Sequence, residues 1–319
     1  MSQRPLKTGL IGLGNMGRNH LRVLSMLKSV DLCFVHDADI DRSRELSAQY
    51  GCRVSSDLDA DLAMVDAVVL ATPTSTHYEY IRRVSDHVTA IFVEKPLTDT
   101  LETSTEITDL AQRKGLRIQV GFIERFNPAV LALKMVLAGT ERIINIDFSR
   151  TNKLSSRITD VDVVTDLMIH DIDLALFLNG PALRVSAYGV MEEGMISFAR
   201  ATITHDNGSF SNITASRITE KRIRKISVTA GDKYIDCNLL RKEVLINKQT
   251  LEQYYEKVSI SSQEETIDVR PEEALLSELM AFVRYAGCGD AVGIPTDLDG
   301  HHAMRIARSV QEIVRGQQR

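Results

Sequence analysis

The chain has 319 residues, of which 44% are hydrophobic and 25% are charged, and its formal net charge at pH 7 is −5. This length can bury a large core and predicts two domains. The negative charge argues against an extended nucleic-acid surface, and no apolar run approaches a membrane span. Four scattered cysteines favour buried thiols in a reducing compartment over a redox or metal role. With no signal-peptide pattern, these features predict a soluble cytoplasmic protein.

The first expected strand, residues 8–11, runs directly into a glycine-rich turn, and a helix is expected over residues 19–28. In such a turn Gly12 allows a tight bend, Gly14 lets the backbone approach a pyrophosphate, and Gly17 lets helix and strand pack closely. The alternative is a turn that binds nothing. We interpret it as a dinucleotide site whose residues are Gly12, Gly14, Asn15, Met16 and Gly17.

The second strand ends at Asp37, 20 residues past Gly17. A carboxylate at this place accepts hydrogen bonds from an adenosine ribose and repels a 2′-phosphate. Asp37 therefore favours NAD over NADP, although Arg42 and Arg44 follow closely and weaken that preference.

Strand and helix signals alternate over the first 123 residues, which predicts an α/β domain with a parallel, doubly wound sheet of the Rossmann type. After residue 123 the pattern changes to a run of strands with few helices, which predicts an α+β domain on a mainly antiparallel, open sheet over residues 124–319. The last helix could pack back on the first domain. Expected strands are 8–11, 32–35, 67–70, 90–93, 117–120, 143–150 and several within 183–260. Expected helices are 41–50, 76–84, 101–114, 128–138, 163–178, 272–285 and 297–315.

Two motifs follow the third and fourth strands, at the carboxyl edge where such sheets bind ligands. Thr72 and Pro73 come first, with His77 at the start of the next helix; a turn proline and a histidine bonded to backbone are the structural alternatives. Glu94 and Lys95 end the fourth strand before a proline whose peptide bond could be cis. We expect all five residues to contact the cofactor, and Lys95 to face its nicotinamide end.

The helix expected over residues 163–178 carries Asp166, His170 and Asp173 at positions i, i+4 and i+7, hence on one face. A histidine between carboxylates can be oriented and have its proton affinity raised, which suits a general acid or base. A metal site would normally need further His or Cys ligands, and none is obvious. A structural polar network is the other alternative, and we predict no metal.

Two basic groups could reach a substrate. Arg125 follows the fifth strand, next to Asn127, which fits a helix cap before Pro128 equally well. Arg217 begins a basic run that would suit a phosphorylated or nucleotide-linked substrate, although such charge is usually a solvated edge. That run continues with Lys221, Arg222, Arg224 and Lys225.

Taken together and in order, these motifs resemble the glucose-fructose oxidoreductase/inositol dehydrogenase/MocA (GFO/IDH/MocA) family over nearly the whole chain. The matching residues are Gly12-x-Gly14-x-x-Gly17 with His20, Thr72-Pro73 with His77, Glu94-Lys95-Pro96, and Asp166-x-x-x-His170-x-x-Asp173. The resemblance implies an NAD(P)-dependent sugar or cyclitol dehydrogenase acting on CH–OH, with Lys95, Asp166 and His170 as catalytic and substrate-contacting residues. It also implies a homodimer or homotetramer assembled through the open sheet.

A narrower resemblance, carried by residues 121–130 and 166–173, is to the branch that contains UDP-N-acetylglucosamine 3-dehydrogenases. It implies a nucleotide-sugar substrate whose 3-hydroxyl becomes a ketone. The alternatives are a dehydrogenase of a free sugar or cyclitol, a glycosidase that oxidises its substrate transiently with bound NAD, and a non-catalytic NAD-binding regulatory module.

Overall fold

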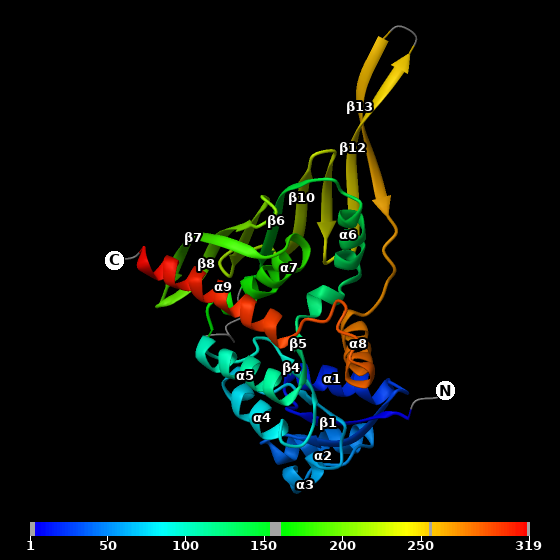
Figure 1. Cartoon of the computed structure of the whole chain (residues 1–319), viewed down its shortest axis with the longest axis vertical. Coiled ribbons are helices and arrows are strands. Elements are labelled where there is room, and N and C mark those ends of the chain that lie inside the picture. The colour runs from blue at the N-terminus through cyan, green and yellow to red at the C-terminus, as the bar shows by residue number, and fades with distance from the viewer. Residues whose placement is uncertain (1–3, 154–160, 255–256, 318–319) are drawn as a thin grey trace. The chain divides into compact units, whose positions relative to one another are not determined.

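The computed structural model describes residues 4–153, 161–254 and 257–317, without the side chains of residues 249–262. The described chain divides into two compact units (Figure 1). The first comprises Met1–Ile123 and Glu273–Met304, and the second Glu124–Glu272 and Arg305–Arg319. The predicted boundary after residue 123 therefore coincides with a division between the units, whereas residues 273–304 cluster with the first unit instead of the second. Residues 154–160, between the strand expected over residues 143–150 and the helix expected over residues 163–178, lie outside the described residues.

The first unit contains a five-stranded, wholly parallel sheet in the order β2-β1-β3-β4-β5. The order reverses between β1 and β3, and in doubly wound sheets ligands bind at the carboxyl ends of the strands beside this switch point. The fold class predicted from the sequence is confirmed for this unit. Its strands are β1 (Leu6–Ile11), β2 (Val30–His36), β3 (Ala67–Leu70), β4 (Ala90–Glu94) and β5 (Arg117–Gly121).

Helix α1 begins at Asn15, four residues earlier than predicted, because Gly14 already has the extended backbone of a helix cap and the chain turns at once into the helix. A 3₁₀ turn, Thr74–Thr76, leads into α4. The helices of this unit are α1 (Asn15–Met26), α2 (Ile40–Tyr50), α3 (Leu58–Leu62), α4 (His77–Val84), α5 (Leu101–Lys114) and α8 (Ala274–Cys288), and α9 (Asp297–Gly316) continues from it into the second unit.

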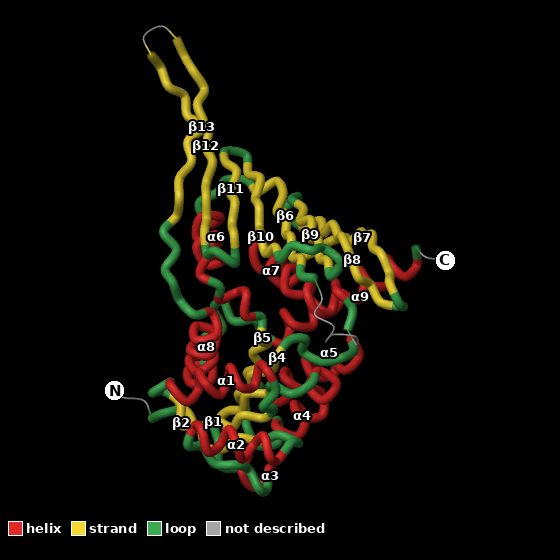
Figure 2. Tube along the Cα trace, turned by 180° about the vertical axis from the view of Figure 1, so that it is seen from behind, coloured by secondary structure: helices red, strands yellow, loops and turns green. Residues whose placement is uncertain are grey.

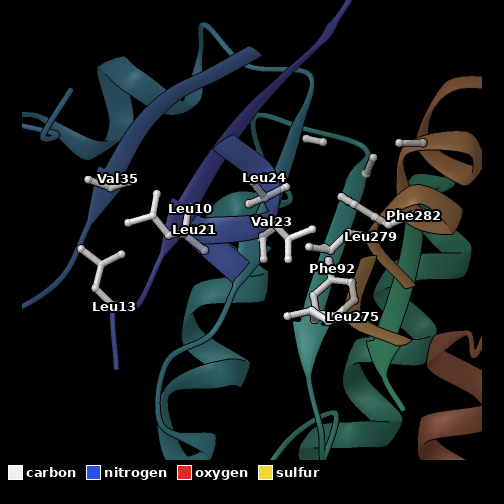
Figure 3. Packing of buried hydrophobic residues seen from close by; sticks show 14 of the residues in the cluster. Leu10, Leu13, Leu21, Val23, Leu24, Val35, Phe92, Leu275, Leu279 and Phe282 are labelled. Carbon is white, nitrogen blue, oxygen red and sulfur yellow. The ribbon is translucent and has the colours of Figure 1, made fainter. Parts of the chain in front are cut away.

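Helix α8 belongs to the first unit because its apolar side chains complete the core there. Leu279 and Phe282 are wholly buried in the same cluster as Leu24 of α1 and Phe92 of β4 (Figure 3). The rings of Phe92 and Phe282 meet edge to face with centroids 5.7 Å apart, a geometry that adds to the burial of two large aromatic groups. The pattern of the sequence near residue 275 predicts a helix but not which sheet it covers.

The second unit contains an eight-stranded sheet in the order β13-β12-β11-β10-β6-β9-β8-β7. All its neighbours pair antiparallel except β6 and β9, which confirms the expected mainly antiparallel sheet. Its strands are β6 (Ile143–Thr151), β7 (Ala182–Glu192), β8 (Met195–His205), β9 (Phe210–Ser216), β10 (Ile223–Ala230), β11 (Lys233–Asn238), β12 (Glu243–Tyr254) and β13 (Lys257–Ile267).

Helices α6 (Pro128–Ala138) and α7 (Ile169–Asn179) pack on one face of this sheet, and Figure 2 shows it from behind. Asn127 caps α6 by accepting from the Ala129 N–H at 3.1 Å, as the capping alternative predicted. The opposite face carries Tyr188, whose side chain is 72% exposed.

None of the described helices is both long and apolar enough to span a membrane.

Replacing Phe282 with Ala should lower the free energy of unfolding by about 3–5 kcal/mol, because it opens a cavity in the core of the first unit. Met280→Ala is the matched control on the same helix: its side chain is 54% exposed, so the change should stay within about 0.5 kcal/mol. Urea unfolding of both variants checks this. Equal, small effects would show that α8 does not belong to this core.

Candidate active site

Each glycine of the first turn meets a different steric demand. Gly12 has φ +94, and a Cβ there would lie 2.5 Å from the Ala71 backbone. A Cβ on Gly17 would lie 2.0 Å from the Gly12 carbonyl oxygen, so only glycine lets α1 approach the turn. A Cβ on Gly14 would meet nothing within 4 Å, which leaves the backbone open from outside. This is the geometry that a pyrophosphate needs at a helix N-terminus, and the residues present fit a dinucleotide.

Asp37 lies beside this turn, at the end of β2. Its Oδ2 accepts a hydrogen bond from the Leu13 N–H at 2.6 Å, and its Oδ1 accepts from the Asp39 N–H at 2.8 Å. Arg42 reaches the same carboxylate, with Nη1 3.4 Å from Oδ1. Arg44 does not, since it pairs with Asp41. A carboxylate and one guanidinium therefore stand together where the adenosine ribose of a dinucleotide is expected.

The loops after β3 and β4 are joined by His77. Its Nε2 is 3.0 Å from the Thr72 carbonyl oxygen, and its Nδ1 is 2.9 Å from that of Pro96. Burial lowers the pKa of His77, and the two carbonyl oxygens oppose that shift. The ring is 1% exposed. Its two contacts join the loop that carries Thr72 and Pro73 to the loop that carries Lys95. These are the backbone contacts that the structural alternative predicted, and contact of His77 with the cofactor stays a prediction.

Glu94 points its carboxylate into the first unit. Its Oε1 lies 2.7 Å from His20 Nε2, and its Oε2 accepts a hydrogen bond from the Lys95 backbone N–H at 3.2 Å. A Cβ on Gly121 would lie 2.9 Å from that Oε2, so the neighbouring strand makes room for it. The Lys95–Pro96 peptide bond is cis, as the sequence suggested. Glu94 therefore contacts the residue that precedes this bond rather than projecting from the sheet edge.

In the second unit, His170 follows a π-helical segment, Val164–Met168, that leads into α7. The Ile169 N–H donates to the Val164 carbonyl, five residues back, which inserts one residue into the turn. Such π segments occur often at functional sites. The helix predicted over residues 163–178 is therefore not regular, and its regular i, i+4 spacing does not hold between Asp166 and His170.

Three arginines bind the three carboxylates of this segment. Arg217 Nη2 is 3.0 Å from Asp166 Oδ2, Arg150 Nη2 is 2.8 Å from Asp171 Oδ1, and Arg125 Nη2 is 2.6 Å from Asp173 Oδ1. Arg125 and Arg150 each bind their carboxylate through two nitrogens. Charge-assisted pairs of this kind fix the geometry of both side chains as well as stabilising the fold. The peptide on either side of His170 is therefore held in place.

The pairing changes the roles expected for individual side chains. Arg125 was expected to reach a substrate, but it is 4% exposed, and its guanidinium is used to neutralise Asp173. Asp173 in turn is 1% exposed, and its charge is balanced by Arg125. Arg217 is also buried, and donates to the Val161 carbonyl besides Asp166.

Arg150 was not among the residues that the sequence predicted for the site. Among the described residues it is the largest fully buried side chain, and it bonds Glu124 at 2.8 Å as well as Asp171. Burial alone would raise the pKa of Glu124, but the charge of Arg150 outweighs it and holds that pKa below its usual range. Arg224 adds a second cation 3.3 Å from Glu124. The signal was present: Arg150 shares a strand face with the apolar Ile146 and Phe148.

Within the described residues, no group of three or more His, Cys, Asp or Glu side chains is arranged to hold a metal ion. The chemistry available at these sites is that of a lysine at the edge of a dinucleotide-binding sheet and of a histidine and carboxylate on an arginine-braced helix. Both suit proton transfer and the stabilisation of an oxygen that gains negative charge.

Comparison with known proteins agrees with this geometry. A family model described as an oxidoreductase family with an NAD-binding Rossmann fold matches residues 6–122, and a GFO/IDH/MocA C-terminal domain model matches residues 139–233. The UDP-N-acetylglucosamine 3-dehydrogenase of Acidithiobacillus ferrooxidans is 31% identical over 97% of this chain and 96% of its own. Inositol 2-dehydrogenase 1 of Mycolicibacterium vanbaalenii is 34% identical over 53% of this chain and 52% of its own.

Solved structures give the same answer. A structure of the Acidithiobacillus ferrooxidans enzyme superimposes with a TM-score of 0.89 at 29% identity, over 99% of this chain and 100% of that one. Because two family models together match most of the chain, and a relative is matched over 97% of it, the chain belongs to the GFO/IDH/MocA family of NAD-binding oxidoreductases.

Proposed function

We propose that this protein oxidises a secondary hydroxyl of a nucleotide sugar, and that the 3-hydroxyl of UDP-N-acetylglucosamine is the first candidate. The observation that carries the proposal is the extent of the match: a relative named for this activity spans 97% of the chain, whereas the inositol 2-dehydrogenase cited above spans 53%. Inositol dehydrogenases support the second candidate, oxidation of a cyclitol or free sugar.

In this proposal three side chains, those of His170, Lys95 and Asp166, carry out the oxidation with NAD. Bound NAD supplies the acceptor for the hydride that leaves the hydroxyl carbon. His170 takes the hydroxyl proton, Lys95 stabilises the oxygen as the ketone forms, and Asp166 orients the acid–base pair. An imidazole can both take up and return a proton at neutral pH, which suits this task. Arg217 acts on the reaction through Asp166, whose carboxylate it holds at 3.0 Å.

A cytoplasmic location is part of the proposal. All four cysteines, Cys33, Cys52, Cys237 and Cys288, are free thiols, which suits a reducing compartment. Burial raises the pKa of Cys237 to about 12, so that thiol is inert.

A substrate screen tests the activity itself. The protein with NAD should produce NADH absorbance with UDP-N-acetylglucosamine and not with free N-acetylglucosamine, glucose or myo-inositol. NADH formation with myo-inositol alone would move the protein to the cyclitol dehydrogenases. Glycosidic cleavage without net NADH would identify transient oxidation instead.

Lys95→Ala and His170→Ala should each lower kcat by about 10²–10⁴-fold, because each removes a group positioned for proton transfer or charge stabilisation. The losses in the double variant should be far from additive, since both groups serve one step. NAD affinity should change little in His170→Ala. His302→Ala, an exposed histidine, is the control and should keep full turnover. Near-normal turnover in His170→Ala would refute its role as the base.

Asp37→Ser should shift the ratio of NAD to NADP affinity by about tenfold or more toward NADP, because a carboxylate that repels the 2′-phosphate is removed. Arg42, 3.4 Å from that carboxylate, is then available to the phosphate. Glu45→Gln, at an exposed position of the same helix, should leave the ratio unchanged. Calorimetric titration of both cofactors measures it. Equal affinities in the unmodified protein would contradict the expected NAD preference.

The second unit should assemble copies of the chain through the uncovered face of its sheet. There Tyr188 and Val190 of β7 are 72% and 46% exposed, next to Arg200 and Phe198 of β8. Tyr188→Glu with Val190→Glu should reduce the mass in light scattering to that of a smaller assembly. Met135→Glu, 73% exposed on α6, should not. A monomeric unmodified protein at micromolar concentration would refute this proposal.

A further inference from the structure

The first unit buries a second carboxyl group that the proposed chemistry does not use. Glu278 lies on α8 and is 0% exposed. Neither of its carboxyl oxygens accepts a hydrogen bond from an N–H or O–H group of the described residues. Its neighbours along the buried face of the helix are apolar, namely Leu275, Leu279 and Phe282. An apolar residue would pack at this position without the cost of burying a polar group.

The register of α8 on β4 places Glu278 beside Glu94. Phe282 meets Phe92 ring to ring at 5.7 Å. Glu278 lies one turn before Phe282, about 6 Å along the helix, and Glu94 lies two residues after Phe92, about 6.6 Å along the strand on the same face. Helix α8 runs antiparallel to β4 (Figure 3), so Glu278 and Glu94 lie on the same side of the aromatic pair and at similar distances from it. Gln119 of β5 fixes α8 there, donating to the Glu278 carbonyl oxygen at 3.2 Å.

Glu94 is the group that connects this interior to Lys95. Its two oxygens meet His20 Nε2 at 2.7 Å and the Lys95 N–H at 3.2 Å. The buried His20 ring also contacts Phe92, with centroids 5.1 Å apart. The groups facing this part of the core are thus His20 from α1, Glu94 from β4, the uncharged Gln119 from β5 and Glu278 from α8.

We propose that Glu278 is a positioning residue for Lys95, which acts as a neutral acid by donating a hydrogen bond to the Glu94 carboxylate. This proposal rests on the catalytic role proposed for Lys95. A carboxylic acid can donate one hydrogen bond, and Glu94 is an acceptor that already holds the Lys95 peptide. An ionised Glu278 would instead repel Glu94, because two carboxylates at one site cannot both ionise without cost.

The electrostatic environment agrees with a neutral acid. Burial, and then the charge of Glu94, raise the pKa of Glu278 well above its ordinary value of 4.5. A carboxyl whose pKa is raised on folding gives stability that is complete below its unfolded value and is lost as pH rises toward the folded one. The unmodified protein should therefore lose stability from pH 4.5 upward relative to a variant that cannot ionise there.

Two substitutions separate hydrogen bonding from packing. Glu278→Gln keeps the shape and a donor but is never charged, and Glu278→Leu keeps the volume approximately but cannot donate. With the substrate that the screen identifies, Glu278→Gln should keep kcat within about twofold and extend activity to higher pH. Glu278→Leu should lower kcat about tenfold, the effect of one hydrogen bond, without raising the KM for NAD. Glu273→Gln, at the exposed start of α8, is the control and should match the unmodified protein.

Two measurements need no substrate, so they test this inference even if the proposed function fails. Infrared difference spectra of unmodified protein against Glu278→Gln at pH 7 should show the carbonyl band of a protonated carboxylic acid. The rate at which an acylating reagent labels Lys95, followed by peptide mass spectrometry, should change severalfold in Glu278→Leu and not in Glu278→Gln. The inference is overturned by an ionised Glu278, or by a Leu variant that matches the unmodified protein in labelling and turnover.

Discussion

Buried charge in this chain is tolerated where a counter-charge meets it, and the segment that carries His170 depends on this rule. Asp166, Asp171 and Asp173 lie in or near the protein interior, and each is bound by an arginine from a different part of the second unit. Removing one partner of such a pair leaves an unpaired buried charge, which commonly costs about 3–5 kcal/mol. Arg217 holds the π-helical turn before His170 through Asp166, and the two fully buried pairs, at Asp171 and Asp173, hold the helix after it and cannot be broken singly without a large penalty.

The first unit meets a different constraint, which is steric. Its glycines are required where the turn, the helix and the loop after β3 approach one another within van der Waals distance, as the 2.0 Å contact of a Cβ on Gly17 shows. Two histidines then tie the functional loops to this frame: His77 bonds the loops after β3 and β4, and His20 holds Glu94. The position of Lys95 is therefore set by the backbone geometry of several elements rather than by its own side chain.

Features that depend on neighbouring residues in the sequence could be predicted, and features that depend on distant residues could not. The bounds of α5 and α6 were predicted to the residue, because Thr100 and Asn127 cap their first turns and Gly115 ends α5 in a left-handed conformation. The π-helical turn could not be predicted, since helical periodicity assumes a regular repeat. The partners of Arg125 and Arg150 could not be predicted either, because each pair joins residues at least 21 positions apart.

The glycine turn and Asp37 recognise features that every dinucleotide shares, so they cannot distinguish one sugar substrate from another. Strand geometry limits which residues of the basic run can face the same ligand. Adjacent residues of β10 point to opposite faces, so Arg224 lies on the side of Glu124 whereas Lys225 pairs with Asp236 on the uncovered side. The basic run that suggested a diphosphate in the sequence is therefore divided, and only part of it can serve any one ligand. A nucleotide sugar would have to be bound by the part that shares a face with the arginine-braced helix.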